Sequence, residues 1–219
     1  MTSLRPTRNR RETASRAVGY MSLVSVAVFP VLLVLLYFLE PEFNPPHLIS
    51  EYQLGHFGWL MSLAFVCLGS GSLFLSRALW PDLRTRGGRL GRSWLLLVGI
   101  AYVGAGIFAP NPVSVIESRL HGLSGIIVIF SSPVVFTLLI NSLVHDQRWS
   151  EVTRLLKWTT LLAWLGLLSF YASIIFYGLG QGQANIVVGW TNRFMIAAYC
   201  AWLATVAWQA IKFCRHESE

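Results

Sequence analysis

The chain is organised as six long apolar runs separated by short polar segments. Each run carries few charged residues and approaches or exceeds the roughly 20 residues that an α-helix needs to cross a bilayer. The runs lie at about residues 17–39, 52–79, 93–109, 111–143, 155–177 and 189–211. The pattern therefore predicts an all-α integral membrane protein, built as a bundle of six transmembrane helices.

The composition of the chain indicates the same class. Hydrophobic residues make up 54% of the sequence and charged residues only 12%, with a mean hydropathy of +0.56. A soluble domain carries about a quarter charged residues. The third run contains Gly99, Gly104 and Gly106. Because small residues let helices approach closely in lipid, we expect these glycines to form a packing face.

The basic residues predict the orientation of the bundle. The formal net charge is +7, and nearly all Lys and Arg residues fall before the first run, after the second, after the fourth and after the sixth. By the positive-inside rule, both termini of this multi-pass cell-membrane protein are cytoplasmic. We expect a disordered basic cytoplasmic tail at residues 1–16, a six-helix transmembrane domain at 17–212 and a short cytoplasmic tail at 213–219. No nucleic-acid module accompanies the arginines, so membrane topology explains the positive charge better than nucleic acid does.

The start of the fourth run brings several ionisable residues together. Asn111 is a good helix N-cap, and Pro112 suits the first helical position. With that start, Glu117 and His121 lie four residues apart on one helix face. Ionisable groups at the end of a membrane helix need water, a partner or a function. This stretch is therefore the first place to look for chemistry.

More polar residues open the second and sixth runs, which begin on the same predicted outer side. The candidate ligand-binding residues are Glu51, His56, Glu117, His121, Trp190, Asn192 and Arg193. The positive dipole ends of three helices point to that side and favour anions, and Arg193 adds a fork-shaped donor. We therefore expect an outward-facing polar pocket that binds a lipid headgroup or small amphiphile, with membrane lipids as partners.

Each of these residues also has a structural interpretation when taken singly. Arg193 would extend to lipid headgroups, Glu117 would complement a helix N-terminus, and Trp190 would lie in the interfacial aromatic belt. The binding hypothesis rests on their joint occurrence at one side of the bundle.

A metal site is a second interpretation of the same residues. His56, Glu117 and His121 have donor types that bind zinc, and a catalytic zinc site needs three protein ligands and a water molecule. The Glu-x-x-x-His spacing places two donors on one face, but it is a short pattern, and nothing in the sequence fixes His56 beside it. Such a site would make the chain an intramembrane hydrolase of a lipid ester or amide.

Two further alternatives remain open at this point. A small proton-coupled transporter would use the outer polar residues, although no charged residue lies near the centre of any apolar run. A scaffold that only packs against a partner helix would fit the glycines of the third run. Neither enzyme status nor oligomeric state follows from the sequence.

Short motifs at these positions carry a family resemblance. They are Ile49-Ser50-Glu51 with Gly58-Trp59, Gly106-Ile107-Phe108-Ala109-Pro110, Leu120-His121-Gly122, and Gly189-Trp190-Thr191-Asn192-Arg193. With them the chain resembles the bacterial and archaeal multi-pass membrane proteins catalogued as domain of unknown function 998, over nearly all residues after 16. The resemblance implies a six-helix fold and directs attention to His121 and Arg193, but it implies no activity. Members often carry an aspartate where this chain has Asn111-Pro112, so any role of that aspartate would be absent or would pass to Glu117.

Overall fold

The structure, a computed structural model, describes residues 5–80, 83, 85–111, 113–178 and 186–216. In chain order its elements are α1 (Arg5–Leu39), η1 (Pro41–Phe43), η2 (Ile49–Leu54), α2 (Gly58–Ala78), α3 (Arg86–Ile107), α4 (Val115–Leu143), η3 (Gln147–Val152), α5 (Thr153–Tyr177) and α6 (Ile186–His216). The elements labelled η are 3₁₀ helices, and the described residues include no β-strand. Six helices contain stretches long and apolar enough to cross a membrane. The predicted all-α, six-helix architecture is therefore confirmed.

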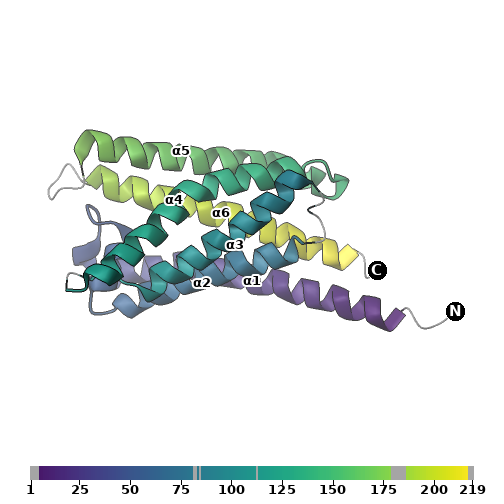
Figure 1. Ribbon diagram of the computed structural model, residues 1–219, viewed down its shortest axis with the longest axis horizontal. Coiled ribbons are helices and arrows are strands. Elements are labelled where there is room, and N and C mark those ends of the chain that lie inside the picture. The colour runs from purple at the N-terminus through teal and green to yellow at the C-terminus, as the bar shows by residue number, and fades with distance from the viewer. Residues whose placement is uncertain (1–4, 81–82, 84, 112, 179–185, 217–219) are drawn as a thin grey trace.

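The helices form an elongated antiparallel bundle with both termini at the same end (Figure 1). We call this end the terminal end and the opposite end, where α2, α4 and α6 begin, the cap end. The first four helices pack each against the next, and α6 packs against both α1 and α5. The assignment of the terminal end to the cytoplasm stays a prediction from the charge pattern.

Helix α4 diverges from α5 towards the cap end (Figure 1). The two helices meet further along α4, where the rings of Phe130 and Tyr171 are 6.1 Å apart and Trp164 Nε1 donates a hydrogen bond to Thr137 Oγ1 at 3.0 Å. Along its length α4 also packs against α3, from Ser124 beside Gly104 to Ser142 beside Gly88. Near the cap end, residues of α4, α5 and α6 contribute to the lining of a pocket that is described below.

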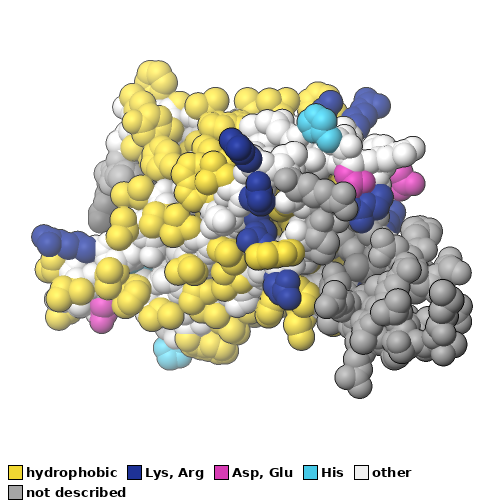
Figure 2. All heavy atoms as spheres, turned by 45° about the vertical axis from the view of Figure 1, so that its right-hand side comes forward, with side chains coloured by type: hydrophobic (Ala, Val, Ile, Leu, Met, Phe, Trp, Pro, Cys, Tyr) yellow, Lys and Arg dark blue, Asp and Glu magenta, His cyan; other side chains and the backbone are white. Residues whose placement is uncertain are grey.

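The outer surface is largely apolar. Figure 2 shows hydrophobic side chains over much of one face, with Lys and Arg side chains in a row across part of it. Large apolar side chains on several helices, such as Val31, Phe38, Ile100 and Phe176, are exposed. A surface of this kind suits contact with lipid tails, in which every backbone polar group must be satisfied inside the protein.

Glycines bring α3 close to its neighbours, as the sequence predicted. A Cβ atom added at Gly69 of α2 would lie 2.6 Å from the carbonyl oxygen of Gly99, and one added at Gly106 would lie 2.7 Å from a carbonyl oxygen of α2. Gly104 makes a similar approach to α4, where Ser124 Oγ would lie 2.8 Å from the added atom. Because real Cβ atoms do not approach so closely, larger residues would force the helices apart.

Two helices begin at other residues than predicted: the second begins later and the third begins earlier. The second was expected to start near Tyr52, but Ile49–Leu54 forms the 3₁₀ helix η2 and α2 begins only at Gly58. Glu51 and His56 therefore lie before this helix rather than in its first turns. The third helix begins at Arg86 instead of residue 93, because Thr85 Oγ1 accepts the N–H of Gly88 at 3.0 Å and caps it there.

The predicted cap of the fourth helix was wrong. Ser114, not Asn111, is its N-cap, and Ser114 Oγ accepts the N–H of Glu117 at 3.4 Å. Asn111 instead forms a turn with its own backbone, in which its Oδ1 accepts the N–H of Val113 at 2.9 Å. Asparagine and serine both favour N-caps, so residue type alone gave no reason to prefer Asn111 over Ser114. Pro112 lies outside the described residues.

The ends of the chain differ in detail from the expected domain limits. Helix α1 begins at Arg5, ahead of residue 17, and α6 extends to His216, past residue 212. Arginine is a good helix former, so continuing a helix beyond its apolar part costs little. The apolar spans themselves are Arg16–Leu39 and Ile186–Lys212. The division into two tails and one transmembrane domain stays a prediction.

Gly69→Ala is expected to lower the free energy of unfolding by about 1–3 kcal/mol, because the new Cβ has no room beside the backbone of α3. Gly87→Ala is the matched control, since a Cβ at Gly87 would have no atom within 4 Å. Thermal unfolding of the full-length protein in detergent measures both. Equal midpoints for the two variants would contradict the packing face.

Candidate functional site

The connection between α1 and α2, residues 40–57, closes the cap end, and we call it the cap segment. Prolines at 41, 45 and 46 exclude a continuous helix, so the segment forms only the short helices η1 and η2. Backbone without helical hydrogen bonds is tolerated beside a membrane only where other protein groups satisfy it. Side chains of α6 and the end of α1 supply those groups.

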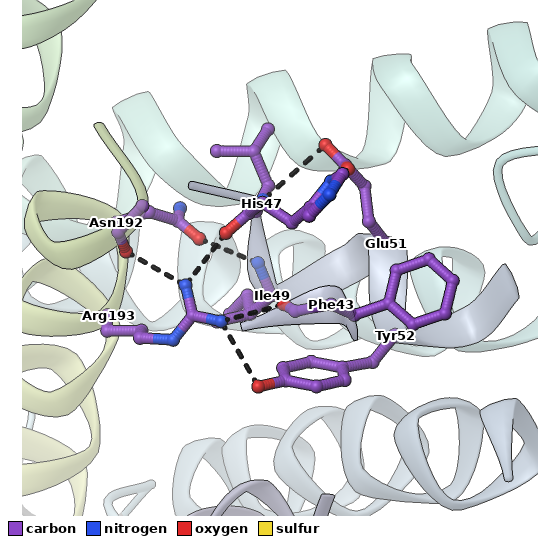
Figure 3. Close-up of polar contacts among 9 residues, drawn as sticks. Phe43, His47, Ile49, Glu51, Tyr52, Asn192 and Arg193 are labelled. Atoms are coloured by element: carbon purple, nitrogen blue, oxygen red, sulfur yellow. Dashed lines mark hydrogen bonds and ion pairs between the residues drawn. The ribbon is translucent and has the colours of Figure 1, made fainter. Parts of the chain in front are cut away.

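Arg193 of α6 holds the cap segment in place (Figure 3). Its Nη1 donates to the carbonyl oxygens of His47 at 2.8 Å and Gly189 at 3.0 Å. Its Nη2 donates to the carbonyl oxygen of Phe43 and to the Tyr52 hydroxyl, both at 3.2 Å. The Arg193 residue is only 9% exposed. Among the described residues no carboxylate lies within ion-pair distance of it. Both terminal nitrogens thus bind neutral oxygens already.

Neighbouring side chains complete this network. Asn192 Oδ1 accepts the N–H of Ile49 at 3.0 Å, and the Tyr52 hydroxyl donates to Asn44 Oδ1 at 2.5 Å. A Cβ added at Gly189 would lie 3.0 Å from the carbonyl oxygen of Pro46, so α6 approaches the cap segment closely there. In the Gly-Trp-x-x-Arg motif, Gly189 therefore lets α6 approach the cap segment closely. The hydrogen bonds of Arg193, which we call the clamp, hold the cap segment there.

Glu40, at the end of α1, is a second anchor, and it was not among the residues predicted from the sequence. It is 1% exposed, and its carboxylate accepts a short hydrogen bond from the backbone N–H of Phe57. A Cβ added at Gly55 would lie 2.6 Å from the Glu40 carboxylate, so only glycine fits there without a shift. Glu40 ends a long apolar run and precedes a proline, which in the sequence resembles an ordinary loop acid. Its burial depends on how the cap segment folds back.

The side chains of Glu51 and His47 contact each other within the cap segment. His47 Nδ1 contacts Glu51 Oε2 at short range, and Glu51 Oε1 accepts the N–H of Leu48 at 3.4 Å. Both side chains are partly exposed. Glu51 thus stabilises the turn that starts η2, and the pair fixes the fold of the cap segment. His47 was not among the residues predicted from the sequence.

Glu117 and His121 have separate partners, although they lie on the same helix. Glu117 Oε2 accepts a hydrogen bond from Asn111 Nδ2 at 2.8 Å and so stabilises the turn before α4. His121 Nδ1 donates to the carbonyl oxygen of Phe108, at the end of α3, at 2.7 Å. No hydrogen bond or ion pair between Glu117 and His121 appears in the described part of the chain. Their shared function is to hold the α3–α4 connection.

His56 and Trp190 lie on the exterior. His56 is exposed, with its ring packed edge-on against Phe57, and Trp190 is 52% exposed. Within the described ranges, no group of His, Cys, Asp or Glu side chains is arranged to hold a metal ion. His56, Glu117 and His121 are therefore not brought together as a zinc site.

A pocket of about 80 Å³ lies beneath the cap segment. It is partly open and largely apolar. Its lining residues come from the cap segment and from α2 to α6: Leu48, Ile49, Ser50, Phe65, Tyr102, Ala105, His121, Gly125, Val128, Ile129, Phe170, Asn192 and Ile196. Two of the predicted binding residues, His121 and Asn192, thus meet at one cavity, whereas Glu51, His56, Glu117, Trp190 and Arg193 do not line it.

The pocket carries a small number of polar atoms. Tyr102 is 1% exposed, and its hydroxyl makes no hydrogen bond of acceptable geometry within the described residues, although Ser132 lies near it. The Ser132 hydroxyl donates instead to the carbonyl oxygen of Val128 at 2.6 Å. Asn192 uses its oxygen for the cap segment, which leaves its NH₂ group as a donor, and His121 retains Nε2. Besides His121 and Asn192, a tyrosine in the middle of an apolar run is a sequence signal for this pocket.

The family model described as "Protein of unknown function (DUF998)" matches residues 9–209 of the chain. The match confirms the resemblance inferred from the short motifs. No curated protein and no solved structure matches the chain.

Arg193→Lys is expected to loosen the cap segment and to lower the free energy of unfolding by about 2–4 kcal/mol, because one ammonium group cannot replace the four hydrogen bonds of the guanidinium fork. Hydrogen–deuterium exchange should become faster in residues 43–52. Arg119→Lys is the control, since Arg119 is exposed at the same end of the bundle. Unchanged exchange in the Arg193 variant would show that the clamp does not hold the cap segment.

Proposed function

This chain belongs to the DUF998 family, and we propose that it binds a neutral membrane amphiphile in the pocket beneath the cap segment. The amphiphile would have an apolar chain and an uncharged head that both donates and accepts hydrogen bonds, as in a monoacylglycerol. The proposal is carried by one observation: a partly open apolar cavity, inside a bundle of apolar helices, is lined by a buried tyrosine whose hydroxyl has no well-formed partner among the described residues.

The apolar character of the pocket supports a hydrocarbon ligand. Most of its lining side chains are aliphatic or aromatic. Leu123, Ile126 and Phe130 are exposed on α4, and Ile175 and Phe176 are exposed on the facing end of α5. A lipid chain could therefore leave the membrane and enter between these helices without crossing a polar surface. Ligand pockets are characteristically apolar with a few placed polar groups. At about 80 Å³ this pocket would take only the head and the first carbons of the amphiphile, and the rest of the chain would lie along the exposed apolar side chains of α4 and α5.

The charges around the pocket support an uncharged head. Arg193 directs its terminal nitrogens to carbonyl and hydroxyl oxygens of the cap segment, and Glu117 is bound by Asn111. Neither lines the pocket. The polar residues that do are Ser50, Tyr102, His121 and Asn192, whose hydroxyl, imidazole and amide groups pair with hydroxyl, ester or amide groups. This replaces the expectation that Arg193 and helix N-termini hold an anionic headgroup.

Gly125→Leu is expected to reduce labelling by a photoactivatable monoacylglycerol about tenfold or more, because the new side chain would fill much of the pocket. An added Cβ at Gly125 meets no atom within 4 Å, so the fold tolerates the change. Gly122→Leu is the matched control: Gly122 lies on the same helix, also has open space, and does not line the pocket. Equal labelling of the two variants would refute binding in this pocket.

Tyr102→Phe is expected to weaken monoacylglycerol binding by roughly threefold to tenfold while leaving the ligand-free melting temperature unchanged or higher, since it removes a buried hydroxyl that lacks a well-formed partner. Tyr199→Phe is expected to do the opposite: it should lower the melting temperature and leave monoacylglycerol binding unchanged. It loses a hydrogen bond of 2.9 Å to the carbonyl oxygen of Ile129, and Tyr199 does not line the pocket. Saturation of the photolabel and thermal unfolding, measured on both variants, separate the two roles. Unaltered affinity in Tyr102→Phe would exclude that hydroxyl from head recognition.

A further inference from the structure

The terminal end carries a second cluster, formed where α2 ends and α3 begins. The guanidinium carbon of Arg92 lies 3.4 Å from the centroid of the Trp80 ring, a stacked cation–π arrangement. Arg77, in the last turn of α2, is close enough for its charge to repel that of Arg92. The Arg92 Nε atom is buried and has no hydrogen-bond partner within the described residues. Two cations are thus held near each other, one of them fixed on an aromatic face.

No acid in the described part of the chain offsets this charge. The contacts between acidic and basic side chains there join His47 to Glu51 and Arg148 to Asp146, and neither involves the α2–α3 turn. Arg86 and Arg89, in the first turns of α3, add two exposed positive charges. Residues 77–92 contain five arginines and one acid, Asp82, which lies outside the described residues. This excess of positive charge favours an anion that bridges guanidinium groups.

We propose that Arg77 and Arg92, with Trp80 as a platform, bind the phosphate of an anionic phospholipid headgroup. Guanidinium groups bind phosphate oxygens through paired hydrogen bonds, and the Trp80 ring keeps one of them oriented. The surroundings favour a lipid over free phosphate. Trp80 is 58% exposed, and Leu90 and Trp94 on the adjoining turns of α3 are also exposed, as expected of side chains at the membrane interface.

This site is independent of the pocket beneath the cap segment. The two lie at opposite ends of the bundle and share no residue. They also select different ligands, because the pocket lacks a free charge and this cluster has an excess of positive charge. Gly125→Leu should therefore leave phospholipid binding at the α2–α3 turn intact, so failure of either proposal leaves the other standing.

The test is a native mass spectrometry titration of the delipidated full-length protein with dioleoylphosphatidylglycerol. Arg77→Gln with Arg92→Gln should weaken the first binding event about thirtyfold, and Arg77→Gln alone about fivefold. Arg154→Gln with Lys157→Gln is the matched control, because it removes the same charge from exposed positions in the first turns of α5, at the same end of the bundle. The control should bind as the wild type does.

Several results would overturn the proposal. The double variant could bind as tightly as the control, or dioleoylphosphatidylcholine could bind wild type equally well. Equal occupancy by inorganic phosphate at the same concentration would overturn the assignment to a lipid. If the double variant does not fold, Arg77→Gln decides alone, since Arg77 is exposed and its replacement leaves the stacked Arg92–Trp80 pair in place.

Discussion

The structure depends on the need to satisfy a stretch of non-helical backbone beside an apolar environment. Prolines prevent the cap segment from forming the hydrogen bonds of a continuous helix, and in lipid an unpaired carbonyl oxygen costs several kcal/mol (about 2–7). Arg193 resolves this for the carbonyl oxygens of Phe43 and His47, and Glu40 does the same for the N–H of Phe57. The buried guanidinium group of Arg193 on α6 donates to backbone carbonyl oxygens, and the buried carboxylate of Glu40, just after α1, accepts from a backbone N–H.

Because the cap segment is tied to α6 and α1, it lies across the bundle end and covers the pocket. Leu48, Ile49 and Ser50 of the cap segment form part of the pocket lining. The clamp and the pocket are therefore mechanically connected through Asn192, whose oxygen holds Ile49 and whose side chain lines the cavity. Any ligand in the pocket would contact residues whose position Arg193 and its neighbours determine.

The contrast between Arg193 and Arg92 shows how neighbours decide the role of one residue type. Arg193 is surrounded by carbonyl and hydroxyl oxygens, so its charge is used within the fold. Arg92 lies on the Trp80 ring with Arg77 near it, and we propose that its charge serves a partner outside the chain. In our proposals the two ends of the bundle therefore differ in chemistry: an uncharged ligand at the cap end and an anionic headgroup at the terminal end.

The sequence by itself determined the fold class, the six apolar spans, the glycine packing face of α3 and the family, because each depends on residue type and spacing along one helix. Only the tertiary structure decided the partners of the polar residues. Arg193 bonds to backbone oxygens roughly 150 positions away, Glu117 bonds to Asn111 rather than approaching His121, and Glu40 is buried where a loop acid was expected. The N-cap of α4 is Ser114 instead of the predicted Asn111, which forms a turn before the helix. The physical reason is that an amphipathic or apolar pattern is local, whereas the oxygen that satisfies a buried guanidinium, and the gap that becomes a pocket, arise only when distant segments meet.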